Sequence, residues 1–208
     1  MKDEVEEMRK ITVCEYADLN DDAKEVALSE VVFNDVFGGK LNDDLKNVLS
    51  NKLRALGIED LELEFDLTYS QGSGVAFYGY IDNAHLWNWV DESKLSDDEV
   101  TLVNACVLGK CELDINIERN FLANRYSHCN TMDINIPSYY ADAPFDDDKM
   151  EELIESLGVK ILEQVQKKSR ALTSLGYEII EEFNSKENIE RLLDTYLIEF
   201  YEDGSLFD

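Results

Sequence analysis

Basic residues are scarce in this 208-residue sequence. Nineteen Lys and Arg stand against 46 Asp and Glu, and the net charge is −27. A field of this sign repels nucleic acid and anionic lipid and attracts basic surfaces. We therefore expect no direct binding to nucleic acid or to a membrane, and a basic macromolecule is the partner that the charge favours. Acidity of this size can also serve solubility alone.

Long apolar runs are absent as well. No stretch reaches the about 18 apolar residues that a membrane-spanning helix needs, and residues 1–10 lack the apolar run of a secretory signal. We expect a cytoplasmic protein, in which the four cysteines stay reduced. Only two prolines and ten glycines occur and no segment repeats, so residues 1–208 are predicted to form one domain, whose oligomeric state stays open and could include a homo-oligomer.

The spacing of apolar residues predicts an α+β fold. Alternation with a period of two predicts strands at residues 11–16, 61–69, 75–82, 111–117, 132–136 and 196–201. Helical spacing predicts helices at residues 21–36 and 41–56, after Ser96, over 150–179 and after Ser185. Hairpin-connected strands between helices indicate a mostly antiparallel sheet of about five to six strands, with helices packed on one face and one long C-terminal helix.

The outward positions of three predicted strands carry carboxylates and no Lys or Arg. The seven carboxylates are Glu62, Glu64, Asp66, Glu112, Asp114, Glu118 and Asp133. Like charges opposite one another destabilise a sheet, so such a face indicates a surface that binds a basic partner. Successive outward positions lie about 6.6 Å apart, a spacing that favours mimicry of a nucleic-acid backbone. In the alternative interpretation, the region around Trp87 and Trp89 covers these residues.

Metal-binding and catalytic residue types occur, but not in the spacing of known motifs. Cys106, Cys111, His128 and Cys129 are zinc-ligand types, yet their spacing favours buried structural cysteines. His85 and His128 are the only histidines, and neither lies in a nucleophile motif. We therefore predict no enzyme, no cofactor and no metal.

Two loops allow either a structural or a ligand-binding interpretation. The turn at residues 71–74 could cradle a phosphate, but a hairpin turn between two strands is favoured. The acidic run at residues 146–148 lacks the glycine and the spacing of an EF-hand loop, so capping of the following helix is favoured over calcium binding.

Three stretches of the sequence resemble a family of small acidic bacteriophage and prophage proteins, which are mostly uncharacterised and sometimes labelled antitoxin-like. The stretches are Ile11–Lys24, Leu67–Gly79, whose Tyr-Ser-Gln-Gly-Ser-Gly turn has Ser73 where the family has Asp, and Ile198–Gly204. The resemblance implies an origin in a phage or mobile element and supplies no catalytic residues. By analogy, small acidic phage proteins often inhibit host defence.

These observations lead to three hypotheses. The first is a non-enzymatic phage-encoded inhibitor of a restriction or CRISPR system, which binds a basic, nucleic-acid-binding host protein through the acidic face. The alternative is an antitoxin-like protein that neutralises its partner by stoichiometric binding. The third is a hydrolase that uses clustered carboxylates and a metal ion.

Overall fold

The computed structural model describes residues 12–70, 72–120, 126–141 and 145–207. The chain divides into two compact units, which we treat separately. The first contains the described residues up to Asp43 and those from Ile179 onward, and the second contains those from Asp44 to Glu178. Ile11, Gln71 and Pro144, which the sequence placed in a strand, in a turn and before a helix, lie outside the described residues.

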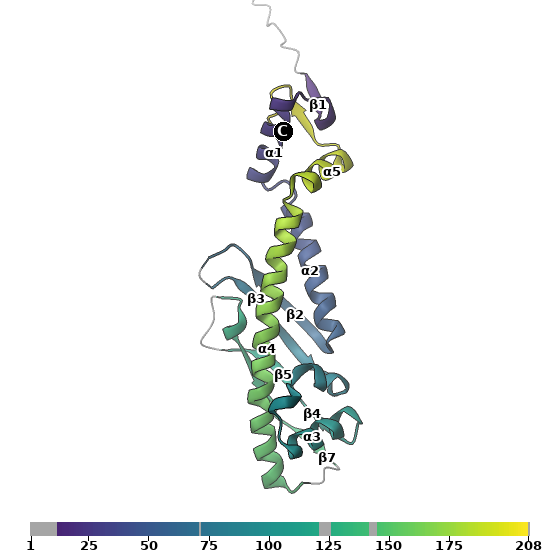
Figure 1. Ribbon diagram of the computed structural model, residues 1–208, viewed down its shortest axis with the longest axis vertical. Helices are drawn as coiled ribbons and strands as arrows, with labels where there is room; N and C mark the ends of the chain where they lie inside the picture. The colour runs from purple at the N-terminus through teal and green to yellow at the C-terminus, as the bar shows by residue number, and fades with distance from the viewer. Residues whose placement is uncertain (1–11, 71, 121–125, 142–144, 208) are drawn as a thin grey trace, which may run out of the picture. The chain divides into compact units, whose positions relative to one another are not determined.

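The chain contains short runs of helices and of strands (Figure 1). The α-helices are α1 (Asp21–Phe33), α2 (Gly38–Ala55), α3 (Asp97–Val107), α4 (Asp147–Phe183) and α5 (Lys186–Tyr196). The strands are β1 (Val13–Glu15), β2 (Ile58–Asp66), β3 (Gly74–Ile81), β4 (Cys111–Leu113), β5 (Asn116–Arg119), β6 (Met132–Asn135), β7 (Tyr139–Ala141) and β8 (Glu199–Tyr201). None of the described helices combines the length and the apolar character that a membrane crossing requires.

The first unit joins the two ends of the described chain. β1 pairs antiparallel with β8, with Cys14 opposite Phe200. The side chain of Asn20 accepts the amide of Ala23 at 3.0 Å and so caps α1, as the sequence predicted. Apolar residues of α1, α5 and the strand pair form a small core around Phe200, which is fully buried.

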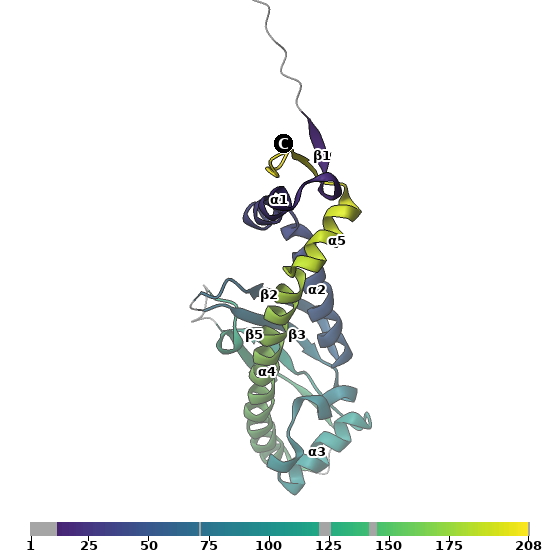
Figure 2. The ribbon, with the colours of Figure 1, turned by 45° about the horizontal axis from the view of Figure 1, so that its top comes forward.

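The second unit is built on a four-stranded antiparallel sheet in the order β2-β3-β5-β6. One face, the core face, carries apolar side chains such as Leu63, opposite Phe77, and Ile117, opposite Ile134. Helix α4 crosses these strands in both views (Figures 1 and 2). Contact is close, because the Ser169 hydroxyl of α4 donates to the Val75 carbonyl of β3.

The predicted α+β class and the long C-terminal helix are confirmed, since α4 spans 37 residues. The predicted single sheet of five to six strands is not: β4 and β7 form a separate two-stranded sheet, and so do β1 and β8. The predicted strand at residues 111–117 is broken into β4 and β5, because Asp114 and Ile115 leave the ladder. The Asp114 amide bonds the Ser138 carbonyl at 3.0 Å, beside the β4–β7 pair.

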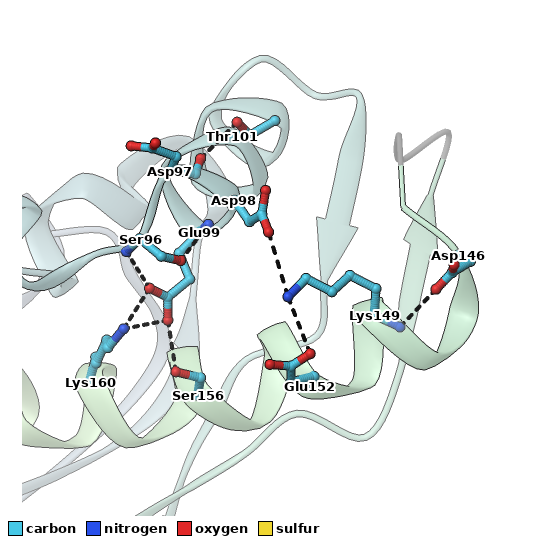
Figure 3. A network of polar contacts seen from close by, with 10 residues as sticks. All are labelled: Ser96, Asp97, Asp98, Glu99, Thr101, Asp146, Lys149, Glu152, Ser156 and Lys160. Atoms are coloured by element: carbon cyan, nitrogen blue, oxygen red, sulfur yellow. Dashed lines mark hydrogen bonds and ion pairs between the residues drawn. The ribbon is translucent and has the colours of Figure 1, made fainter.

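A buried carboxylate ties α3 to α4 (Figure 3). Glu99 is 1 % exposed and completes a capping box with Ser96 at the start of α3. Its carboxylate also accepts hydrogen bonds from Lys160, at 2.5 Å for the longer of the two, and from Ser156 at 2.8 Å. Burial disfavours the charged form, but the bonds from Lys160, Ser96 and Ser156 outweigh it and lower the pKa of Glu99 to about 2.

Candidate acidic interface

The face of the four-stranded sheet opposite the core face, here called the open face, carries the predicted carboxylates of β2. Residues directly opposite on paired antiparallel strands share a face. Glu62 lies opposite Tyr78 and Glu64 opposite Ala76, while their neighbours Leu63 and Phe77 point to the core. The predicted alternation of β2 is therefore confirmed.

β5 and β6 add carboxylates to the open face. Glu118 lies directly opposite Asp133, and both side chains are exposed. Neutral groups satisfy them in part, since the Asn135 amide donates to Glu118 at 2.9 Å and the Ile134 backbone amide donates to Asp133 at 2.9 Å. Glu62, Glu64, Asp66, Glu118 and Asp133 thus share one sheet, as the sequence predicted.

Strand β3 separates the two acidic rows. Its outward residues Tyr78 and Tyr80 lie between β2 and β5, so the rows are about 9.6 Å apart, which is two strand spacings. Among the described residues of this sheet, Glu118 and Asp133 are the only like charges that face each other. The repulsion that the sequence suggested is therefore smaller than in a sheet whose acidic strands are direct neighbours.

The expectation of a face without bases is wrong. Arg119, at the end of β5, forms an ion pair with Glu64, and its guanidinium lies 5.2 Å from the centre of the Tyr78 ring. Ser127 donates to the second oxygen of Glu64 at 3.2 Å. Glu64 is therefore engaged within the protein, whereas Glu62 remains exposed.

Glu112 and Asp114 do not lie on this sheet. Glu112 belongs to β4 and faces Tyr140 of β7, and Asp114 follows β4 outside any strand. Asp114 accepts from Asn116 at 3.2 Å and from Ser138 at 3.5 Å. The sequence pattern could not separate them from β5, because the alternation runs unbroken through both segments.

A groove of about 380 Å³, which we call the sheet groove, is cut into the open face. It is lined by Asp60, Glu62, Tyr78, Gly79, Tyr80, Asn116, Ile117, Glu118 and Arg119. A β-bulge between Glu59 and Glu62 shapes it and places Asp60 at φ +47°. Gly79 (φ +139°) permits the close approach, because a Cβ there would stand 2.4 Å from the Glu59 carbonyl oxygen.

The floor of the sheet groove holds a buried phenol. Tyr78 is 7 % exposed, and its hydroxyl is a buried side-chain polar atom without a hydrogen-bond partner among the described residues. Burial raises the pKa of Tyr78, which the nearby Thr131 hydroxyl opposes in part. The Thr131 hydroxyl itself donates to the His128 carbonyl at 2.7 Å.

A second hollow, of about 550 Å³, lies beside the sheet groove and shares Tyr80 with it; we call it the α3–β4 pocket. Its lining includes the carboxylates Glu59, Asp82, Glu112 and Asp114, and no Lys or Arg. Hydrogen bonds from the Ala84 amide and from His85 lower the pKa of Asp82. Glu112 and Asp114 thus belong to the same acidic surface as the sheet groove, although they lie on different secondary structure.

Sequence reasoning missed three carboxylates of this surface. Asp60 sits in the bulge, Glu59 immediately before it, and Asp82 follows β3. A bulge has no signal in the alternation of apolar residues, so their convergence was not predictable. The alternative interpretation, in which the region around Trp87 covers the carboxylates, does not hold for Glu62, which is exposed; Trp89 is fully buried in the core.

Of the four zinc-ligand types, Cys106 and Cys111 lie close enough for their thiols to interact, but they do not form a metal-binding group with His128 and Cys129. Cys106 and Cys111 are buried, as predicted for structural cysteines, and burial raises the pKa of both thiols. Cys129 bonds to Asn130 instead, and all four cysteines are free thiols. Within the described residues, no three His, Cys, Asp or Glu side chains are grouped so that they could hold a metal ion.

The two loops have the structural roles that the sequence favoured, a hairpin connection and a helix cap. β2 and β3 form an antiparallel hairpin, and in the described part of the connection between them the Ser73 hydroxyl accepts the Ser70 amide at 3.0 Å. The Asp146 carboxylate accepts the Lys149 amide at 3.0 Å, so this acid caps α4.

Searches of protein-family models, of curated proteins and of solved structures returned no match to this chain. The resemblance to phage proteins therefore stays a prediction.

Proposed function

We propose that this protein is a non-enzymatic inhibitor that captures a basic, nucleic-acid-binding protein on the surface formed by the sheet groove and the α3–β4 pocket. The observation that carries the proposal is the meeting of two acidic hollows at one exposed tyrosine. Tyr80 is 47 % exposed and lines both. Around it the two linings hold seven carboxylates and one base, Arg119, which is already paired with Glu64.

A protein that normally binds phosphate groups can also bind carboxylates. Ionised carboxylates and phosphates both act only as hydrogen-bond acceptors, and the guanidinium of Arg can bind a carboxylate or a phosphate through two parallel hydrogen bonds. Tyr80 adds a ring face on which a guanidinium can stack. Two acidic rows about 9.6 Å apart offer such a protein charges on both sides of the ring.

The biological setting of the proposal is the inhibition of a host defence system of the restriction or CRISPR type in the bacterial cytoplasm. Its support is the acidic surface together with the resemblance to phage proteins. The antitoxin-like alternative uses the same stoichiometric binding and differs in the identity of the partner.

The experiment is a pulldown from bacterial lysate with the tagged full-length protein, at low and at moderate salt. Two matched triple variants accompany the wild type. E62K/E112K/E118K reverses three exposed carboxylates of the proposed surface, and E178K/E181K/E182K reverses three exposed carboxylates of α4. Each reversal adds two charges, so the two variants carry the same net charge, −21 in place of −27.

We expect the wild type and the α4 variant to retain basic nucleic-acid-binding proteins that salt or added DNA releases, and the surface variant to lose them. Equal retention by both variants would refute the proposal. A single small partner that resists salt and DNA would instead support the antitoxin-like function.

A further inference from the structure

β6 is the last strand of its sheet, and within the described ranges no strand pairs with its outer edge. The Asn120 amide donates to the Thr131 carbonyl at 2.8 Å, in the register that continues through the β5–β6 pair. Alternate residues of an antiparallel strand bond to the same neighbour, so the backbone amides and carbonyls of Met132 and Ile134 point away from β5. Such a row is a template for another strand.

The side chain of Asp133 occupies part of the hydrogen-bonding capacity of this edge. Asp133 accepts the Ile134 amide at 2.9 Å and thereby occupies an outward donor of the edge. An incoming strand offers a carbonyl to Ile134 and releases the exposed carboxylate of Asp133. A strand with a basic residue can pair with this carboxylate, so Asp133 favours a basic strand over others.

Beyond the edge lies a groove of about 520 Å³ between β6 and α4, which we call the edge groove. Its apolar lining includes Ile134, Ile136, Ile154, Val159 and Leu162, with Gly158 contributed by α4. Val159 is 60 % exposed, although it belongs to a helix whose neighbouring residues pack on the core face. A strand added to β6 would cover this side chain.

Charge decides which strand fits. The acidic residues of the lining are Asp133, Glu151 and Glu155, and the lining contains no Lys or Arg. A second copy of this chain would bring its own Asp133 and its net charge of −27 to the same place. Like charges opposite one another destabilise strand pairing, so a basic strand of another protein is the fitting occupant.

The geometry points to the β6 edge as a docking site for an extended segment of a partner in which apolar residues alternate with Lys or Arg. The segment pairs with β6 as a fifth strand. Its apolar side chains enter the edge groove against Val159, and its basic side chains point to the other face of the sheet and pair with Asp133. This site is separate from the sheet groove and does not depend on the proposed function.

The first test uses synthetic peptides of about eight residues that alternate Val and Lys, titrated into the full-length protein by calorimetry. A second peptide carries Glu in place of Lys. Two further peptides carry methyl groups on alternate backbone nitrogens, one on the Val and one on the Lys amides. We expect the Glu peptide to bind at least about tenfold more weakly than the Val-Lys peptide. The same loss is expected for one of the two methylated peptides, the one in which the methyl groups replace the amide hydrogens that face β6. The other methylated peptide should bind like the parent.

Variants locate the site. Val159→Arg places a positive charge on the groove wall and should weaken the Val-Lys peptide about tenfold, whereas Val26→Arg, at a 43 % exposed valine of α1, should leave binding unchanged. Asp133→Asn keeps an oxygen for the Ile134 amide but removes the charge, so the preference for the Lys peptide over a Val-Thr peptide should fall. Glu62→Lys in the sheet groove lies on β2, at the other end of the strand order from β6, and should have no effect, which separates this site from the proposed function.

Hydrogen exchange supplies the backbone readout. Bound peptide should slow the exchange of the Ile134 amide. Equal binding of both methylated peptides and the parent, or undiminished binding to Val159→Arg, would overturn the inference. So would protection of Ile134 by self-association of the protein without peptide.

Discussion

Two places in the second unit show opposite uses of a carboxylate. At the α3–α4 junction, Glu99 is buried and surrounded by donors from Lys160, Ser156 and Ser96. In the sheet groove, Glu62 and Glu118 are exposed, and the one base nearby is paired with Glu64. A carboxylate that is enclosed with its base stabilises the fold, and one left exposed without a base is available to a partner.

The largest effect is expected from breaking the buried pair. Lys160→Met should lower the free energy of unfolding by about 3 kcal/mol or more, because Glu99 then stays buried without its cation. Chemical denaturation measures this loss. Lys94→Met is the matched control, since Lys94 forms a half-exposed pair with Glu163 of α4, and it should lower the free energy of unfolding much less than Lys160→Met does.

The buried carboxylate should also determine stability in acid. The pKa of Glu99 falls from an ordinary 4.5 to about 2 on folding, so ionised Glu99 stabilises the protein above pH 4.5. This contribution, about 3 kcal/mol, is lost as the pH falls from 4.5 through about 2. Thermal unfolding of the wild type and of Glu99→Gln should differ most near neutral pH and converge towards pH 2. A constant difference would contradict the prediction.

In the sheet groove, the loss of a carboxylate can stabilise the protein. Asp60 has φ +47°, a conformation that glycine adopts more readily, so Asp60→Gly should raise the free energy of unfolding by about 0.5 kcal/mol. Capture of a basic partner should weaken at the same time. Glu62→Gly is the control: it lies in regular strand and should destabilise by about 1 kcal/mol.

The smallest effect on stability is expected from E62K/E112K/E118K. Exposed positions away from the core tolerate substitution within about 0.5 kcal/mol, while partner capture should be lost. A strong destabilisation would show that these carboxylates serve the fold, as Glu99 does, and would remove the contrast between the two places.

Local signals in the sequence determined much of the fold. Asn20, Ser96 and Ser185 each cap the helix predicted after them, because a cap needs only a side chain and an amide two or three residues on. The alternation of β2 likewise settled which of its side chains face the core. The sequence did not show that the strands form separate sheets. The alternation continues unbroken through Asp114, although β4 before it and β5 after it belong to different sheets.

The tertiary structure alone decided which carboxylates meet a base. Glu99 and Glu62 both belong to acid-rich stretches, yet Glu99 meets Lys160 across 61 positions of the chain, and Arg119 meets Glu64 across 55. The bulge at Asp60 and the close approach at Gly79 also have no local signature. Composition and period reflect each residue's own preference for water or core, whereas pairing and grooves depend on which distant segments the packing brings together.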